Sequence, residues 1–167
     1  MGARRAAREL ALQALYQLDV AGAGDPGVAL FWSHLDAEPA EVHPGASEAR
    51  RARSARALDG PPGEEIEVFA HELVDGVAAH RERIDALIAA SAEHWRLPRL
   101  ARVDLGLLRL AAFELLARPD IPASVTIDEA VEIARRFGSE DSPAFVNGVL
   151  DHIAQVLGVK ERPKSPE

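Results

Sequence analysis

The sequence predicts an all-α fold, and three observations support this prediction. Alanine, leucine, arginine and glutamate, which are all good helix formers, dominate the 167 residues. Apolar residues recur at three- and four-residue spacing in most of the chain, and residues that begin or end helices separate these segments. No segment shows the alternating pattern of a half-buried strand. We therefore expect a helical bundle.

The first predicted helix runs from Ala3 to Asp19, and Asp25–Pro26 predicts the start of a short helix that reaches Leu35. Residues 36–62 differ in composition because they hold four prolines and few large apolar side chains. We predict a disordered or loosely helical insert there. Its cluster of four arginines, Arg50–Arg56, is interpreted as part of a solvated tether in preference to an RNA-binding arm.

A helical pattern resumes at Glu64, with a predicted break near His80, and Pro98 ends the region. Residues 101–117 are apolar almost all round, which is typical of a helix at the centre of a bundle. Unpaired burial of charge is costly. The charged residues of this helix must therefore reach partners or the rim of the domain; they include Asp104, Arg109 and Glu114.

The last third of the chain contains clear signals for where helices begin and end. Thr126 and Glu129 form a capping-box pattern that predicts the start of a helix, and Gly138 is placed to end it. Ser142–Pro143 predicts the start of the final helix, which should end near Gly158.

Asn147–Gly148 is a strong hairpin signal, yet helical spacing continues through it, so we predict an unbroken helix. A glycine within a helix costs about 1 kcal/mol relative to alanine. We attribute Gly148 to the close approach of a neighbouring helix, and the alternative is a ligand or partner that contacts the backbone there.

Composition and motifs favour a binding protein over an enzyme. The chain has no cysteine, no apolar run long enough to span a membrane, and no glycine-rich phosphate loop or nucleophile motif. Its six histidines lack the spacing of metal ligands, so we expect no metal site, and we also expect no cofactor. Without a membrane-spanning run, a signal-peptide pattern or cysteine, the default expectation is a cytoplasmic protein. A net charge of −8 argues against general nucleic-acid binding but leaves room for a local basic surface.

Two segments could form such a surface. Arg4, Arg5 and Arg8 lie in the first two turns of the first helix, where phosphate contact and a merely solubilising helix end are about equally supported. Residues 137–145 join two helices, and the second helix offers free backbone N–H groups at its start. By composition alone, Phe145 is expected to lie in the core.

Four segments together resemble the NusB family of transcription antitermination proteins, over the whole chain except residues 36–62. They are RRAARELALQALY (4–16), RVDLGLLRLAAFEL (102–115), IDEAVEIAR (127–135) and FVNGVL (145–150). The resemblance implies two three-helix bundles that share one core, in a single domain over residues 1–160 with a flexible tail over 161–167. It also implies a factor without catalytic activity.

The resemblance further implies the partners. Such proteins bind boxA, a single-stranded element of nascent ribosomal RNA transcripts, together with a small-subunit ribosomal protein, and other Nus factors and RNA polymerase complete the complex. By position, seven residues are expected to lie on the RNA side and two near the ribosomal protein. The first set is Arg4, Arg5, Arg8, Tyr16, Asp141, Ser142 and Phe145, and the second is Arg102 and Asp104.

The sequence departs from the family pattern at some positions. Residues 36–62 are longer than usual, and Ala123 stands where some relatives carry an aromatic side chain. The acidic Asp141 would repel RNA, which suggests a restraint that makes RNA binding depend on the ribosomal partner. One alternative is a helical RNA-binding module of the kind joined to ribosomal RNA methyltransferases, although residues 1–167 contain no nucleotide-binding motif. Another is a protein–protein adaptor that does not need Arg4, Arg5 or Arg8.

Overall fold

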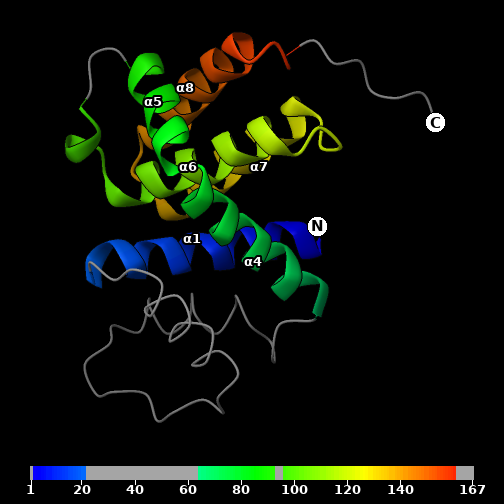
Figure 1. Ribbon diagram of the computed structural model, residues 1–167. Helices are drawn as coiled ribbons and strands as arrows, with labels where there is room; N and C mark the ends of the chain where they lie inside the picture. Colours follow the sequence, from blue (N-terminus) through cyan, green and yellow to red (C-terminus); the bar gives the residue numbers. More distant parts are fainter. Residues whose placement is uncertain (1, 22–63, 93–95, 161–167) are drawn as a thin grey trace. The chain divides into compact units, whose positions relative to one another are not determined.

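A computed structural model describes residues 2–21, 64–92 and 96–160 of the chain, and all the regular structure in these ranges is helical (Figure 1). The all-α prediction is confirmed. No described helix is both long and apolar enough to cross a membrane. The elements are α1 (Ala3–Ala21), α4 (Glu64–Ala79), α5 (Arg81–Ser91), the 3₁₀ turn η1 (Leu97–Arg99), α6 (Arg102–Ala117), α7 (Ala123–Phe137) and α8 (Ser142–Val156).

The chain divides into two compact units, Met1–His71 and Glu72–Glu167, with the boundary inside α4. In the first unit, α1 buries the apolar face that its sequence predicts, including Leu10, Ala14 and Leu15. Several predictions lie outside the described residues: the short helix after Asp25, the insert over 36–62 with its arginine cluster, and the tail over 161–167.

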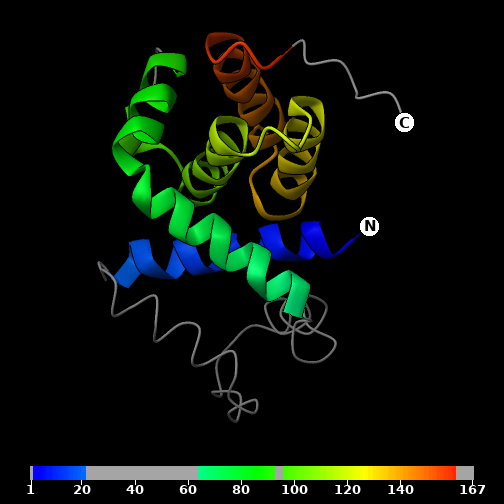
Figure 2. The same cartoon turned by 45° about the vertical axis from the view of Figure 1, so that its right-hand side comes forward.

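Helix α6 is the centre of the second unit, as its apolar sequence predicts. Eleven of its residues are buried, and it contacts α5, α7 and α8. Figure 2 shows α5 and α7 on opposite sides of α6, and α7 also packs along α8. Leu107, Leu108 and Leu110 are almost fully enclosed. This burial explains why the segment carries no polar face.

Two charged residues in the middle of α6, Arg109 and Glu114, reach partners as expected. The Arg109 guanidinium donates two hydrogen bonds to the Asp85 carboxylate, at 2.9 and 3.1 Å, which ties α6 to α5. The carboxylate of Glu114 is buried and accepts a hydrogen bond from the Thr126 hydroxyl of α7 at 3.5 Å. Arg109 is thus paired with an opposite charge, and the buried Glu114 side chain has a hydrogen-bond donor, as burial of polar groups requires.

The predicted break near His80 is confirmed, since α4 ends at Ala79 and α5 begins at Arg81. The His80 ring donates from Nδ1 to the carbonyl oxygen of Gly76 at 2.9 Å, which satisfies a carbonyl near the end of α4. Gly76 has no room for a side chain, because a Cβ there would lie 2.2 Å from Cζ of Phe113 in α6.

The capping-box prediction at Thr126 is wrong. Helix α7 begins at Ala123, three residues earlier, with Pro122 at the cap position. The backbone N–H groups of Val125 and Thr126 bond to the Pro122 carbonyl oxygen, so Thr126 is already inside the helix. Its hydroxyl faces the core and donates a hydrogen bond to the Glu114 carboxylate instead. A local pattern of sequence does not reveal such a distant partner.

The predictions for α8 are confirmed at its C-terminal end and corrected at Gly148. The helix runs unbroken through Asn147–Gly148 and ends before Gly158, whose φ of 68° is the left-handed conformation that glycine favours. The N–H groups of Gly158 and Val159 bond back to Gln155 and Ala154, which closes the helix end. At Gly148, however, a Cβ would meet no atom of the described residues within 4 Å. Among the described residues, therefore, no neighbouring helix approaches this glycine closely.

Candidate nucleic-acid interface

The three N-terminal arginines lie in the first unit and differ in exposure. Helix α1 starts where the N–H groups of Arg5 and Ala6 bond to the carbonyl oxygen of Gly2. The Arg4 side chain is exposed, Arg5 is partly buried, and Arg8 is only 4% exposed. The three residues are therefore not equivalent as contacts for a phosphate group.

Arg4 and Arg8 share one aromatic neighbour, Phe69 of α4. Their guanidinium carbons lie 5.9 and 5.6 Å from the centre of the Phe69 ring, within the range of cation–π attraction. Phe69 is itself 8% exposed. Sequence patterns gave no sign of this arrangement, because the residues lie more than sixty positions apart in the chain.

Tyr16 is 40% exposed, which makes it one of the few large apolar side chains on the described surface. It follows Arg5 by eleven residues, so the two lie within about 20° of each other around the helix axis and about 16 Å apart along it. Arg5 and Tyr16 thus share one face of α1, and this face combines a cation with an aromatic ring.

The junction between α7 and α8 lies in the second unit, and Ser142 holds it together. The Ser142 side chain is 1% exposed. Its Oγ accepts the Ser139 N–H at 2.9 Å and lies 3.1 Å from the Ser139 hydroxyl, while its own N–H donates to the Ser139 carbonyl oxygen. The prediction that Ser142 caps α8 is off by one residue, because Asp141 occupies the cap position, where its side chain makes no capping hydrogen bond to the described start of α8.

Gly138 ends α7, as predicted, but the reason is space. Its φ of −90° suits any residue. A Cβ at this position would lie 2.5 Å from both Cβ and Oγ of Ser142 and 2.8 Å from the carbonyl oxygen of Ala134. The turn closes tightly only because this side chain is missing.

Asp141 and Phe145 lie four residues apart at the start of α8 and therefore on one face of it. Asp141 is exposed and Phe145 is half-buried, and the Phe145 N–H bonds to the Asp141 carbonyl oxygen. The location of Phe145 is intermediate between the core position that composition suggests and the surface position that the family resemblance implies.

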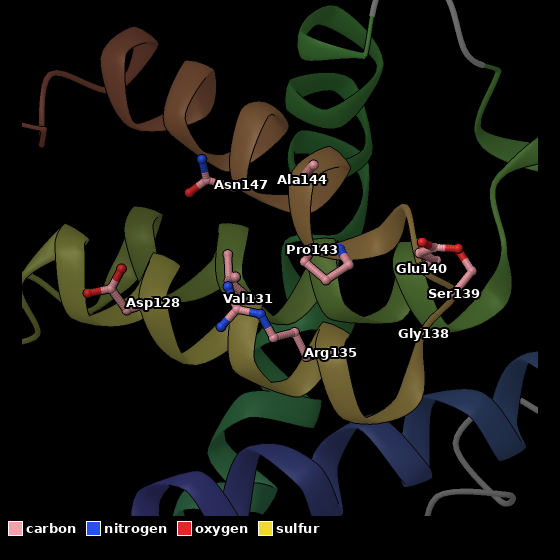
Figure 3. A pocket seen from close by; sticks show the side chains of 9 residues that line it. All are labelled: Asp128, Val131, Arg135, Gly138, Ser139, Glu140, Pro143, Ala144 and Asn147. Atoms are coloured by element: carbon pink, nitrogen blue, oxygen red, sulfur yellow. The ribbon is translucent and has the colours of Figure 1, made fainter.

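An open groove of about 830 Å³ runs between α7 and α8, and no sequence pattern indicates it (Figure 3). Arg135 lies along its α7 side and is paired with Glu132. The predicted RNA-side residues of the junction do not line it. Its walls are Asp128, Val131, Arg135, Gly138, Ser139, Glu140, Pro143, Ala144 and Asn147.

The predicted protein-partner residues stand at the start of α6. Arg102 is exposed, whereas Asp104 is only 8% exposed. Oδ1 of Asp104 is buried without a hydrogen-bond partner among the residues that the structure describes. Buried polar atoms are nearly always hydrogen-bonded, so this oxygen is an exception that calls for an explanation. The first turn of a helix favours a negative charge but supplies no donor to Oδ1 here.

Within the first unit, the predicted residues Arg4 and Arg8 meet at Phe69, which was not among the predicted site residues. Within the second unit, Asp141, Ser142 and Phe145 lie together at the start of α8. Within the described ranges, no three histidine or acidic side chains gather as metal ligands would.

The chain is similar to known proteins along nearly its whole length. Residues 5–155 match the model of the NusB family. The transcription antitermination protein NusB of Geobacter sulfurreducens is 48% identical over 158 residues, which cover 94% of this chain and 97% of that protein.

Solved structures share the fold. The structure of Thermotoga maritima NusB superposes with a TM-score of 0.70 at 35% identity, covering 91% of this chain and 90% of that one. A structure of the antitermination factors NusB and NusE with double-stranded RNA has a TM-score of 0.66. At 23% identity, with 92% of this chain and 97% of that one covered, this likeness concerns the fold alone.

Proposed function

Because the chain belongs to the NusB family, we propose that it is a transcription antitermination factor that binds boxA RNA together with a small-subunit ribosomal protein. The observation that carries this proposal is its similarity, along nearly the whole chain, to proteins named for transcription antitermination. In this proposal the protein acts without catalysis in the cytoplasm, and other Nus factors and RNA polymerase join the complex on nascent ribosomal RNA transcripts.

On the RNA side, the exposures support different roles for the residues of α1. Arg4 is exposed and Arg5 is partly so, and both are assigned to phosphates, while Tyr16 on the Arg5 face is assigned to the RNA path. Two phosphate contacts would give a salt slope of only about −1.4 on a single strand. Such binding is weak, and a second surface is needed to recognise bases.

The junction is assigned to this second surface. Phe145 offers part of an aromatic ring, and Asp141 lies beside it on α8. The buried Ser142 acts by holding the turn that presents them, since its hydrogen bonds are made to Ser139. Aromatic side chains near single-stranded RNA commonly stack on unpaired bases.

Arg102 and Asp104 are assigned to the ribosomal protein. The buried Oδ1 of Asp104 has no hydrogen-bond donor within the described part of this chain. A donor from a bound partner would satisfy it, and a protein–protein interface is where such a group gains most from a new hydrogen bond.

A titration tests the function. A short boxA-like single-stranded RNA is titrated with the full chain at two salt concentrations, with and without the small-subunit ribosomal protein, and fluorescence anisotropy reports binding. We expect weak binding by the chain alone and tighter binding that depends on the RNA sequence when the ribosomal protein is present. Equal affinity for a scrambled RNA in both conditions would rule out boxA recognition.

A further inference from the structure

We propose that Phe69 is a positioning residue for RNA binding, because its ring holds the guanidinium of Arg4 in place for a phosphate. This inference rests on the proposed function, in which Arg4 contacts RNA. We call Phe69, Arg4 and Arg8 together the Phe69 clamp. The guanidinium carbons of both arginines lie within 6 Å of the centre of the Phe69 ring.

The spacing of the two arginines makes the clamp possible. Arg4 and Arg8 are separated by one turn of α1, so their side chains project from the same face. Two like charges at this spacing repel each other. The negative face of an aromatic ring attracts both, and this attraction offsets the repulsion. An aliphatic side chain at position 69 would fill similar space without attracting either cation.

The two arginines have different exposures and therefore different roles in the clamp. Arg8 is as enclosed as the ring itself, so its guanidinium belongs to the clamp. Arg4 reaches solvent while it remains near the ring. A phosphate can therefore approach Arg4 directly, whereas Arg8 would have to leave its buried site.

The benefit of the clamp is preorganisation. A free arginine side chain samples many rotamers, and it loses that freedom when it binds a phosphate. If Phe69 already limits the motion of Arg4, less freedom is lost on binding and affinity rises. The effect of Phe69 on RNA affinity should then require the Arg4 side chain.

A double-mutant cycle on the full chain tests this. RNA affinity is measured for the wild type, Phe69→Leu, Arg4→Ala and the double variant, with the boxA-like RNA as probe at low salt. We expect Phe69→Leu to weaken binding about three- to fivefold, the size of an exposed cation–π contact. In the Arg4→Ala background, Phe69→Leu should cause no further loss. Phe69→Tyr, which keeps the ring, should bind like the wild type.

Two controls separate positioning from folding. Val68→Ala, at the exposed neighbouring position of α4, should leave affinity unchanged. The motion of the Arg4 side chain, followed by NMR relaxation of its Nε–H group in the free protein, should increase in Phe69→Leu and not in Phe69→Tyr. This measurement needs no RNA, and Phe69→Met can replace Phe69→Leu in both experiments should the latter fail to fold.

The outcomes distinguish the inference from the proposed function. An equal loss from Phe69→Leu with and without Arg4, or unchanged Arg4 motion, overturns the clamp while RNA binding stands. If the wild type binds boxA-like RNA but Arg4→Ala binds equally well, the phosphate role of Arg4 is wrong and the inference fails with it. Absence of RNA binding by the wild type, even with the ribosomal protein, refutes the proposed function itself.

Discussion

Gly138 and Ser142 approach each other so closely that a Cβ on the glycine would lie 2.5 Å from the serine Oγ. That Oγ is also the acceptor for the Ser139 N–H, so the contact and the hydrogen bond are parts of one tight turn. The turn sets the start of α8, and with it the positions of Asp141 and Phe145 on the proposed RNA surface. We therefore expect changes in this turn to affect both stability and the proposed RNA binding.

The first prediction concerns Gly138→Ala. The added methyl group would push against Ser142 and the Ala134 carbonyl oxygen, so the free energy of unfolding should fall by about 1–3 kcal/mol. Denaturant unfolding followed by circular dichroism measures this change. Wild-type stability in this variant would show that the turn relaxes easily and that its geometry is not restrictive.

Gly148→Ala is the matched case in which the methyl group has room. Since no described atom lies within 4 Å of the added methyl group, we expect the free energy of unfolding to rise by about 1 kcal/mol, the helix propensity gain. If a ligand or partner approaches the backbone there, RNA or partner affinity should fall although the fold is more stable. Thermal unfolding and the RNA titration, made on the same variant, would reveal these opposite changes. A less stable variant would contradict the first expectation.

A third prediction concerns Asp141→Asn. Asparagine keeps the shape and the helix-capping tendency of aspartate, so stability should stay within about 0.5 kcal/mol of the wild type. Removal of the exposed negative charge should strengthen RNA binding, most clearly at low salt where charges are least screened. Anisotropy titrations at two salt concentrations check this. Unchanged or weaker binding would refute the proposed restraint by Asp141.

The start of α6 supports a fourth prediction. Asp104→Ala removes a carboxylate oxygen that has no donor among the described residues, so the loss of stability should be less than about 1 kcal/mol, the value of its favourable place in the first helical turn. Affinity for the small-subunit ribosomal protein should fall about tenfold or more, as when one partner of a buried polar contact is lost. Calorimetric titration measures the affinity, with Val156→Ala, an exposed position at the end of α8, as control. If Asp104→Ala binds the ribosomal protein as tightly as the wild type, Asp104 is not part of the partner surface.

The sequence was sufficient to predict most helices and the family, because both depend on short patterns. The apolar spacing of α1, the central position of α6 and the unbroken course of α8 through Gly148 are all local or periodic properties. The resemblance to NusB likewise rests on short segments, and residues 5–155 match that family.

Only the tertiary structure decided how individual side chains are used. Thr126 bonds to Glu114 twelve residues away, Phe69 lies beside two arginines of α1, and the space beside Gly148 is open within the described part of the chain. The physical reason is that periodicity reveals which face of a helix is buried but not which atoms meet on it. The choice between a cap and a core hydrogen bond, or between a phosphate contact and a buried guanidinium, depends on neighbours that are distant in the chain.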